Sequence, residues 1–328
     1  MSRTFNLFDI SRYRTQLMGV ASIMILFCHA SPYGVEMPHS LRVLFGFGNL
    51  GVDIFLLLSG LGCYYSLTNI RGSLKDWYIK RFLRILVPYT YIQIPFVLCY
   101  LCVGLFDFYD YFYVFSTLAF WTEHRGAWYV ALLIPLYLFT PLIYSLNCSK
   151  YRILYFSLIG VVLLVICHYN FVIENGTLKN IVCNCQWAFK RCISFLIGML
   201  MAPAIKQRCS VSVSLIVYCL LVYLVCYYFF RNLFLGWILV PVFIYVYVYV
   251  LKLFMNCVLY KFITWIGKIS LESYLANIYL CSLFKNFSCI GILSFNEPAL
   301  EYLFIVVTGL VLSYVTNLLS MKTKNIVL

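Results

Sequence analysis

The amino-acid sequence predicts an all-α integral membrane protein, a polytopic helical bundle of about ten spans. Hydrophobic residues make up 64% of its 328 residues and charged residues only 11%, whereas a soluble domain carries about 25% charged residues. Apolar runs recur along the whole chain, and most approach the ~20 residues that a helix needs to cross a bilayer. Because lipid offers the backbone no hydrogen-bond partners, these spanning segments are expected to be helices.

The apolar runs fill residues 1–328 as a single membrane domain, and no soluble appended domain and no cleavable signal pattern are expected. A further, partly inserted segment is possible over Tyr109–Trp121. The ten expected spans are Leu17–Ser31, Phe45–Tyr65, Ile85–Phe106, Trp128–Leu146, Ile153–Tyr169, Ile193–Ile205, Val211–Phe230, Phe234–Leu253, Ile263–Leu283 and Leu300–Leu319.

The distribution of basic residues predicts that both termini are cytoplasmic. With that orientation, only seven of the 24 Lys and Arg residues fall outside, which leaves 17 on the inner side and satisfies the positive-inside rule. The seven are Arg42, Arg125, Lys179, Lys190, Arg191, Arg231 and Lys285. The same rule explains the net charge of +13, so no nucleic-acid partner is expected, whereas membrane lipids are.

The fifteen cysteines do not predict a disulfide framework, because most of them lie inside apolar runs, where a free thiol behaves as a small hydrophobe. Cys183 and Cys185 share a loop, but their spacing is too tight for an easy mutual bridge. No Cys/His cluster has the spacing of zinc ligands, so no metal is expected.

A titratable side chain, His29, lies inside the first apolar run, where its burial requires a partner or a purpose. Asp53 lies about eight residues, or ~12 Å, into the second run from its outer end, at a depth close to that of His29. We therefore expect a catalytic pair in which Asp53 orients the imidazole for general-base chemistry. A purely structural helix contact or ion pair is the alternative.

The densest basic cluster lies before the third span. Arg81 and Arg84 are three residues apart, so both project from one helix face at the inner mouth of that span. Arg14 precedes His29 by fifteen residues, or roughly 22 Å of helix, and projects within about 60° of it. These three arginines are predicted to bind a cytosolic, phosphate-bearing cofactor. Anchoring by the positive-inside rule, or binding of anionic lipid, is the alternative.

Two further groups are candidates for substrate binding. Glu123, His124 and Trp128 lie at an outer span entrance, where the aromatic residues predict either a sugar-stacking lip or an interfacial aromatic belt. Asn277 places a polar side chain in the ninth run, where a hydrogen bond within the bundle is the alternative.

Four stretches, in order and over nearly the whole chain, together resemble the acyltransferase-3 family of bacterial integral-membrane O-acyltransferases. They are Leu17-Met-Gly-Val-Ala with His29-Ala30; Gly51-Val-Asp-Ile-Phe with Ser59-Gly60; Lys80-Arg81-Phe-Leu-Arg84-Ile-Leu-Val-Pro88-Tyr89; and the later landmarks Trp128-Tyr-Val, Pro141-Leu and Trp265-Ile-Gly267-Lys-Ile-Ser270-Leu-Glu-Ser-Tyr274-Leu275. The family usually places an arginine where this chain has Met18, and we expect Arg14 to substitute for it. Family members also often carry histidine at the position of Asn277.

The resemblance implies transfer of an acetyl or other short acyl group from cytosolic acyl-CoA, with acetyl-CoA as the expected donor, to a hydroxyl of a cell-surface or lipid-linked glycan. It implies a multi-pass enzyme of the plasma (inner) membrane that acts on a polysaccharide or glycolipid of the cell envelope. His29 would deprotonate the acceptor or briefly carry the acyl group. A proton-coupled transporter of a glycan, lipid or small solute, and a non-catalytic partner in glycan assembly, are the alternative classes.

Overall fold

The computed structural model describes residues 4–105, 107–229, 235–255, 257–289 and 295–327. Four residues named above lie outside these ranges: Phe106, Phe230, Arg231 and Phe234. The helices are α1 (Phe8–Arg12), α2 (Arg14–Tyr33), α3 (His39–Gly46), η1 (Phe47–Asn49), α4 (Leu50–Thr68), α5 (Leu74–Cys102), α6 (Phe108–Phe115), α7 (Leu118–Glu123), α8 (Trp128–Cys148), α9 (Arg152–His168), α10 (Gly176–Phe189), α11 (Cys192–Lys206), α12 (Val213–Phe229), α13 (Gly236–Leu253), α14 (Val258–Lys268), α15 (Ser270–Cys289) and α16 (Pro298–Val327).

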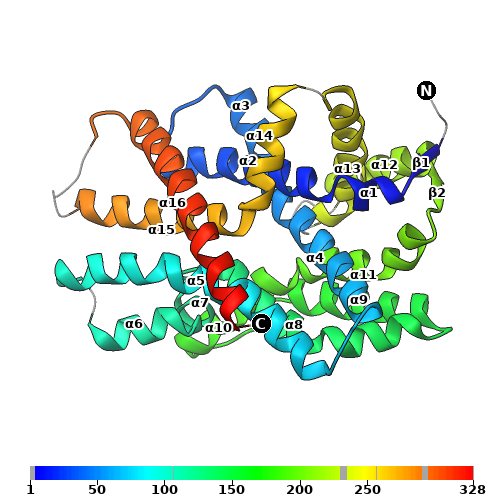
Figure 1. Cartoon of the computed structure of the whole chain (residues 1–328), viewed down its shortest axis with the longest axis horizontal. Helices are drawn as coiled ribbons and strands as arrows, with labels where there is room; N and C mark the ends of the chain where they lie inside the picture. Colours follow the sequence, from blue (N-terminus) through cyan, green and yellow to red (C-terminus); the bar gives the residue numbers. More distant parts are fainter. Residues whose placement is uncertain (1–3, 106, 230–234, 256, 290–294, 328) are drawn as a thin grey trace.

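The all-α class is confirmed, since helices make up most of the described chain (Figure 1). Among the described residues, seven segments are long and apolar enough to cross a membrane, and α9 and α12 are shorter apolar helices. The expected ninth span, Ile263–Leu283, is instead two helices, because the chain leaves the helical conformation at Ile269 between α14 and α15. The segment Tyr109–Trp121 forms the short helices α6 and α7.

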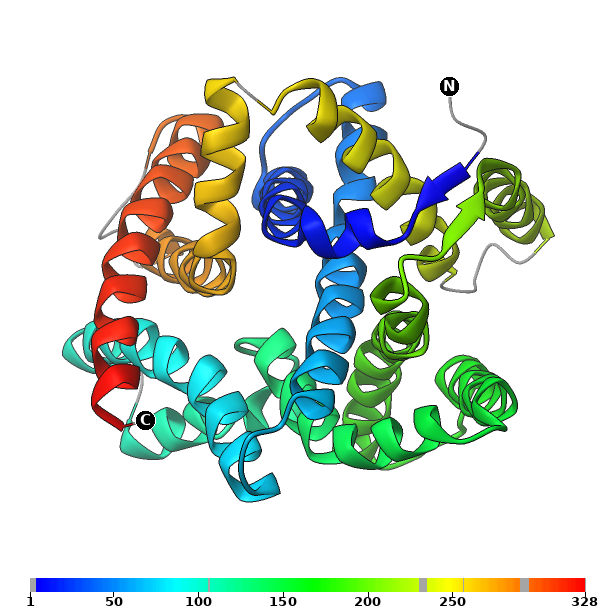
Figure 2. The same ribbon diagram turned by 45° about the vertical axis from the view of Figure 1, so that its right-hand side comes forward.

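Helix α4 passes through the middle of the molecule and packs against α2 and α11 (Figure 2). It is hydrophobic all round, as expected of a helix that is buried on every side. Helix α16 crosses α15 and α5, so the last helix of the chain packs against one from its first third (Figure 1).

Small residues let α4 and α11 pack closely. A Cβ atom added to Gly60 would meet the backbone of Phe195, and one added to Gly198 would meet the backbone of Leu57. Backbone contact of this kind is typical of helix pairs in membranes. Gly60 and Gly198 therefore belong to the packing surface between α4 and α11.

The N-terminal segment holds the start of α2 in place. Strand β1 (Thr4–Asn6) pairs with β2 (Ser210–Ser212) in an antiparallel ladder. Asp9 of α1 forms an ion pair with Lys252 of α13, with 2.5 Å between Oδ2 and Nζ. Helix α1 then ends at Arg12, and α2 begins two residues later at Arg14, so this side chain lies on a fixed part of the backbone.

Candidate active site

His29 lies near the C-terminal end of α2 and lines a small buried cavity between α2, α4 and α15. The volume of this cavity is about 10 Å³, close to the smallest space that holds one water molecule. The remaining lining residues are Ser22, Ile25, Leu26, Phe55, Ser273, Tyr274 and Asn277. His29 is therefore enclosed among polar and aromatic groups and is not exposed to lipid on this face.

The side chain beside the His29 ring is Asn277 of α15, which interacts with the imidazole. Asn277 is 3% exposed, and its oxygen accepts a weak hydrogen bond from the Cys281 thiol at 3.8 Å. The structure thus brings together two of the predicted site residues, from helices that are about 250 residues apart in the chain.

The prediction that Asp53 orients His29 is wrong, because the carboxylate is engaged elsewhere. Arg191 donates to Asp53 Oδ2 at 2.6 Å, and Ser194 donates to Asp53 Oδ1 at 2.8 Å. Arg191 also donates to the side chain of Asn49 at 2.7 Å. Asp53 therefore connects α4 to the start of α11. The similar depth of Asp53 and His29 in the membrane did not identify the partner of Asp53.

Arg191, one of the seven basic residues expected on the outer side, is buried and belongs to this cluster. The side chain is 1% exposed and lies over the rings of Trp128 and Trp187. A signal was present: Arg191 and Ser194 are three residues apart at the start of an apolar helix, and so face one neighbour. A buried carboxylate requires such a partner.

A second, larger cavity is lined by basic side chains and has a volume of about 160 Å³. The three predicted cofactor-binding residues, Arg14, Arg81 and Arg84, all line it. Lys268 and Lys324 add two cations that the sequence analysis did not assign to the site, and Glu272 is the single anion in the lining. Five cations against one anion make this cavity suited to a polyanionic ligand.

Hydrogen bonds to α4 hold two of these arginines. Arg14 donates to the Leu58 carbonyl at 3.2 Å, and Arg81 donates to the Gly62 carbonyl at 2.9 Å. The guanidinium of Arg81 also lies 5.7 Å from the centre of the Trp77 ring. Arg14 is the first residue of α2, whereas His29 lies one turn before its end, so one helix carries a residue of each cavity.

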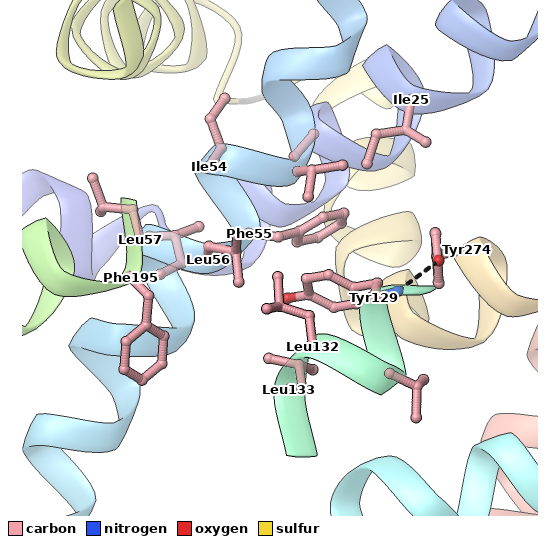
Figure 3. Close-up of a cluster of buried hydrophobic side chains, with 14 of the residues drawn as sticks. Ile25, Ile54, Phe55, Leu56, Leu57, Tyr129, Leu132, Leu133, Phe195 and Tyr274 are labelled. Atoms are coloured by element: carbon pink, nitrogen blue, oxygen red, sulfur yellow. Dashed lines mark hydrogen bonds between the residues drawn. The ribbon is translucent and has the colours of Figure 1, made fainter. Parts of the chain in front are cut away.

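Phe55 and Tyr274 belong to the walls of both cavities. Figure 3 shows Phe55 beside Tyr129, with Tyr274 next to them. The ring centres of Phe55 and Tyr129 are 6.1 Å apart, and the Tyr274 hydroxyl accepts a hydrogen bond from the Tyr129 backbone at 3.1 Å. These aromatic rings therefore form the partition between the basic cavity and His29.

The predicted outer lip is only partly assembled. Trp128 and His124 both contact Trp187 of α10, with ring centres 4.5 and 4.8 Å apart. His124 Nδ1 lies 2.9 Å from the Asn184 oxygen. Glu123 instead forms an exposed ion pair with Arg125 at 2.5 Å, and no contact joins it to His124 or Trp128 among the interactions of the described residues.

Acidic and phenolic groups outside the predicted site lie one turn beyond His29. Tyr33 donates to Glu301 of α16 at 2.6 Å, and Glu301 is 9% exposed. The hydroxyl of Tyr302 donates to the Leu26 carbonyl of α2. Tyr33 follows His29 by four residues on the same helix face, which was the available signal.

In the part of the chain that the structure describes, no group of three or more His, Cys, Asp or Glu side chains gathers as a metal site would require. The family model described as an acyltransferase domain matches residues 16–318. That range includes both cavities except for Arg14 and Lys324. No curated protein and no solved structure matches the chain.

Proposed function

Because the chain belongs to the acyltransferase-3 family and is a multi-pass membrane acyltransferase, we propose that it is an O-acyltransferase. The acyl group, acetyl or another short chain, comes from cytosolic acyl-CoA and goes to a hydroxyl of a cell-surface or lipid-linked glycan. The observation that carries this proposal is the pair of cavities, one lined by five cations and one by His29, with a shared aromatic wall.

The basic cavity supports a phosphate-bearing donor. Arginine forms paired, charge-assisted hydrogen bonds with phosphate oxygens, and a cluster of cations adds long-range attraction. Arg84 is exposed in the cavity wall and Arg81 is hydrogen-bonded to α4, so a ligand meets one exposed and one oriented guanidinium. On the predicted orientation this cavity faces the cytosol, where acyl-CoA is present.

The path from the phosphate-binding arginines to His29 runs parallel to α2. From Arg14 to His29 the helix rises roughly 22 Å at ~1.5 Å per residue. In the wall of the basic cavity, Tyr137, Leu133 and Tyr129 follow one face of α8 over ~12 Å. A donor whose phosphates bind the arginines and whose arm extends along this face delivers its thioester to the partition at Phe55 and Tyr274.

His29 acts as the general base in this proposal. It accepts the proton of the acceptor hydroxyl, and Asn277, not Asp53, is the side chain that contacts the ring. Trp128 and Trp187 are half-buried aromatic side chains in contact with each other, and aromatic rings of this kind stack on sugars, which supports a glycan acceptor. We place the enzyme in the plasma membrane, where such glycans are assembled.

The direct test is transfer of a radiolabelled acetyl group from acetyl-CoA to the glycan fraction of membranes that contain the protein. His29→Ala is expected to abolish transfer while the protein inserts and folds normally. His168→Ala is the matched control, because His168 lies at the end of α9 and outside both cavities. Transfer that persists in His29→Ala refutes the proposal, and solute uptake without any acyl transfer would favour the transporter class.

A further inference from the structure

We infer that Asn277 is a catalytic residue whose amide N–H groups bind the oxyanion that forms during acyl transfer. The inference rests on the proposed function and assigns to this side chain a role at the acyl carbonyl, beyond contact with His29. It starts from an amide nitrogen that has no hydrogen-bond acceptor within the described part of the chain, although the residue is only 3% exposed.

An unpaired buried amide nitrogen is costly, since such a donor loses its hydrogen bonds to water and gains none in return. Asn277 Nδ2 bears this penalty in the wall of the cavity that also contains His29. A donor kept vacant beside a candidate base is the arrangement expected of a group that is preorganised for a charge absent from the resting enzyme.

Three neighbours hold the Asn277 side chain, namely the Cys281 thiol, the His29 ring and the Tyr302 hydroxyl, while Nδ2 has no acceptor in full hydrogen-bonding geometry among the described residues. The oxygen accepts the thiol hydrogen of Cys281, one turn later on α15. The side chain also lies against the His29 ring. A carbonyl oxygen that binds Nδ2 therefore places its carbon next to a hydroxyl held by His29, so that both partners of the reaction meet in one small space.

The chemistry balances with these two side chains. The acceptor oxygen attacks the thioester carbon, its proton passes to His29, and the carbonyl π electrons move to the oxygen, where Asn277 N–H donates to the oxyanion. When the carbonyl re-forms, the C–S bond breaks and the departing thiolate takes the proton from His29. The products are an O-acyl ester and a free thiol, and His29 returns to its neutral form. An acyl-histidine route forms an oxyanion at the same carbonyl, so the assignment holds for both.

The test uses two non-transferring analogues of acetyl-CoA: a ketone, with a methylene group between sulfur and carbonyl, and an S-alkyl compound of equal length without the carbonyl. Both are titrated into the purified full-length protein. The wild type is expected to bind the ketone roughly 5-fold more tightly than the S-alkyl compound, the size of one neutral hydrogen bond. In Asn277→Leu that preference is expected to disappear. Asn286→Leu, on an exposed part of α15, is the matched control that keeps it.

Turnover provides a second measurement. Asn277→Asp keeps the shape but loses the donor, and it is expected to lower kcat by about 10²–10³-fold with little change in the KM for the donor. If the ketone preference is equal in the wild type and in Asn277→Leu, or is absent from the wild type, the inference is overturned and the proposed function stands. If neither analogue binds the wild type, the proposed donor itself is refuted.

Discussion

Arg191 and Asp53 form an ion pair with a distance of 2.6 Å between Nη1 and Oδ2, and both side chains are almost completely shielded from solvent. The pair joins α4 to the segment that connects α10 and α11. Because Asn49 and Ser194 satisfy further donors and acceptors of the two groups, the cluster is a connected polar network within an apolar bundle. This polar network therefore holds α4, the helix that lines both cavities, against α11.

Removal of one charge from this pair is expected to destabilise the protein strongly, whereas removal of both is not. Arg191→Met leaves a buried carboxylate unpaired and is expected to cost about 3–5 kcal/mol. The double substitution Asp53→Leu with Arg191→Met is expected to recover most of the loss. Thermal unfolding of the purified protein measures both. Arg125→Gln breaks an exposed ion pair and serves as the control, with an expected change of about 0–1 kcal/mol. A double variant as unstable as the single one would contradict this account.

The arginines of the basic cavity are expected to act on donor binding and not on the chemical step. Arg84→Ala removes one charge-assisted contact and is expected to raise the KM for acyl-CoA roughly 10-fold at unchanged kcat, since uniform binding affects KM alone. The effect is expected to shrink as salt is added. Lys75→Ala removes a charge from the same helix outside both cavities and is the control. Equal effects of the two substitutions would show that only overall charge matters.

The sequence predicted the membrane class, the helical fold and the basic site because each depends on a local pattern. Apolar runs gave the helices, and the spacing of Arg81 and Arg84 gave a common face that the structure places in one cavity with Arg14. The partner of Asp53 and the neighbour of His29 depend on which helices touch. The depth of a residue along its span does not show which helices touch, and Arg191 and Asn277 come from helices far along the chain. The break at Ile269 was missed although Lys268 and Ser270 flank it, because the apolar residues on both sides together have the length of one span.

Phe55 is expected to limit the length of the acyl chain. Its ring lies in the wall between the basic cavity and His29, where the thioester must be placed. Phe55→Leu shortens this wall, so kcat/KM for a six-carbon acyl donor is expected to rise relative to acetyl-CoA by about 10-fold, within the 10–200-fold that small changes of an apolar pocket give. Parallel assays with donors of two, four and six carbons measure the preference. An unchanged preference, in a variant that folds normally, would place the acyl chain elsewhere.

Gly62 offers a way to test Arg14 without changing its charge. A Cβ atom at position 62 would lie 2.6 Å from Nη2 of Arg14, the end of a flexible side chain, and meets no backbone. Gly62→Ala is therefore expected to displace the guanidinium from the cavity wall while leaving the helix intact, and alanine favours a helix over glycine by roughly 0.5–1 kcal/mol. If Arg14 binds the donor phosphates, the KM for acyl-CoA rises as it does in Arg14→Ala, and the melting temperature does not fall.

Gly160→Ala, on α9 with open space around the added atom, is the control for the helix effect and is expected to leave KM unchanged. If Gly62→Ala retains the wild-type KM while Arg14→Ala does not, the displaced guanidinium still reaches the donor; if neither changes KM, Arg14 does not bind it.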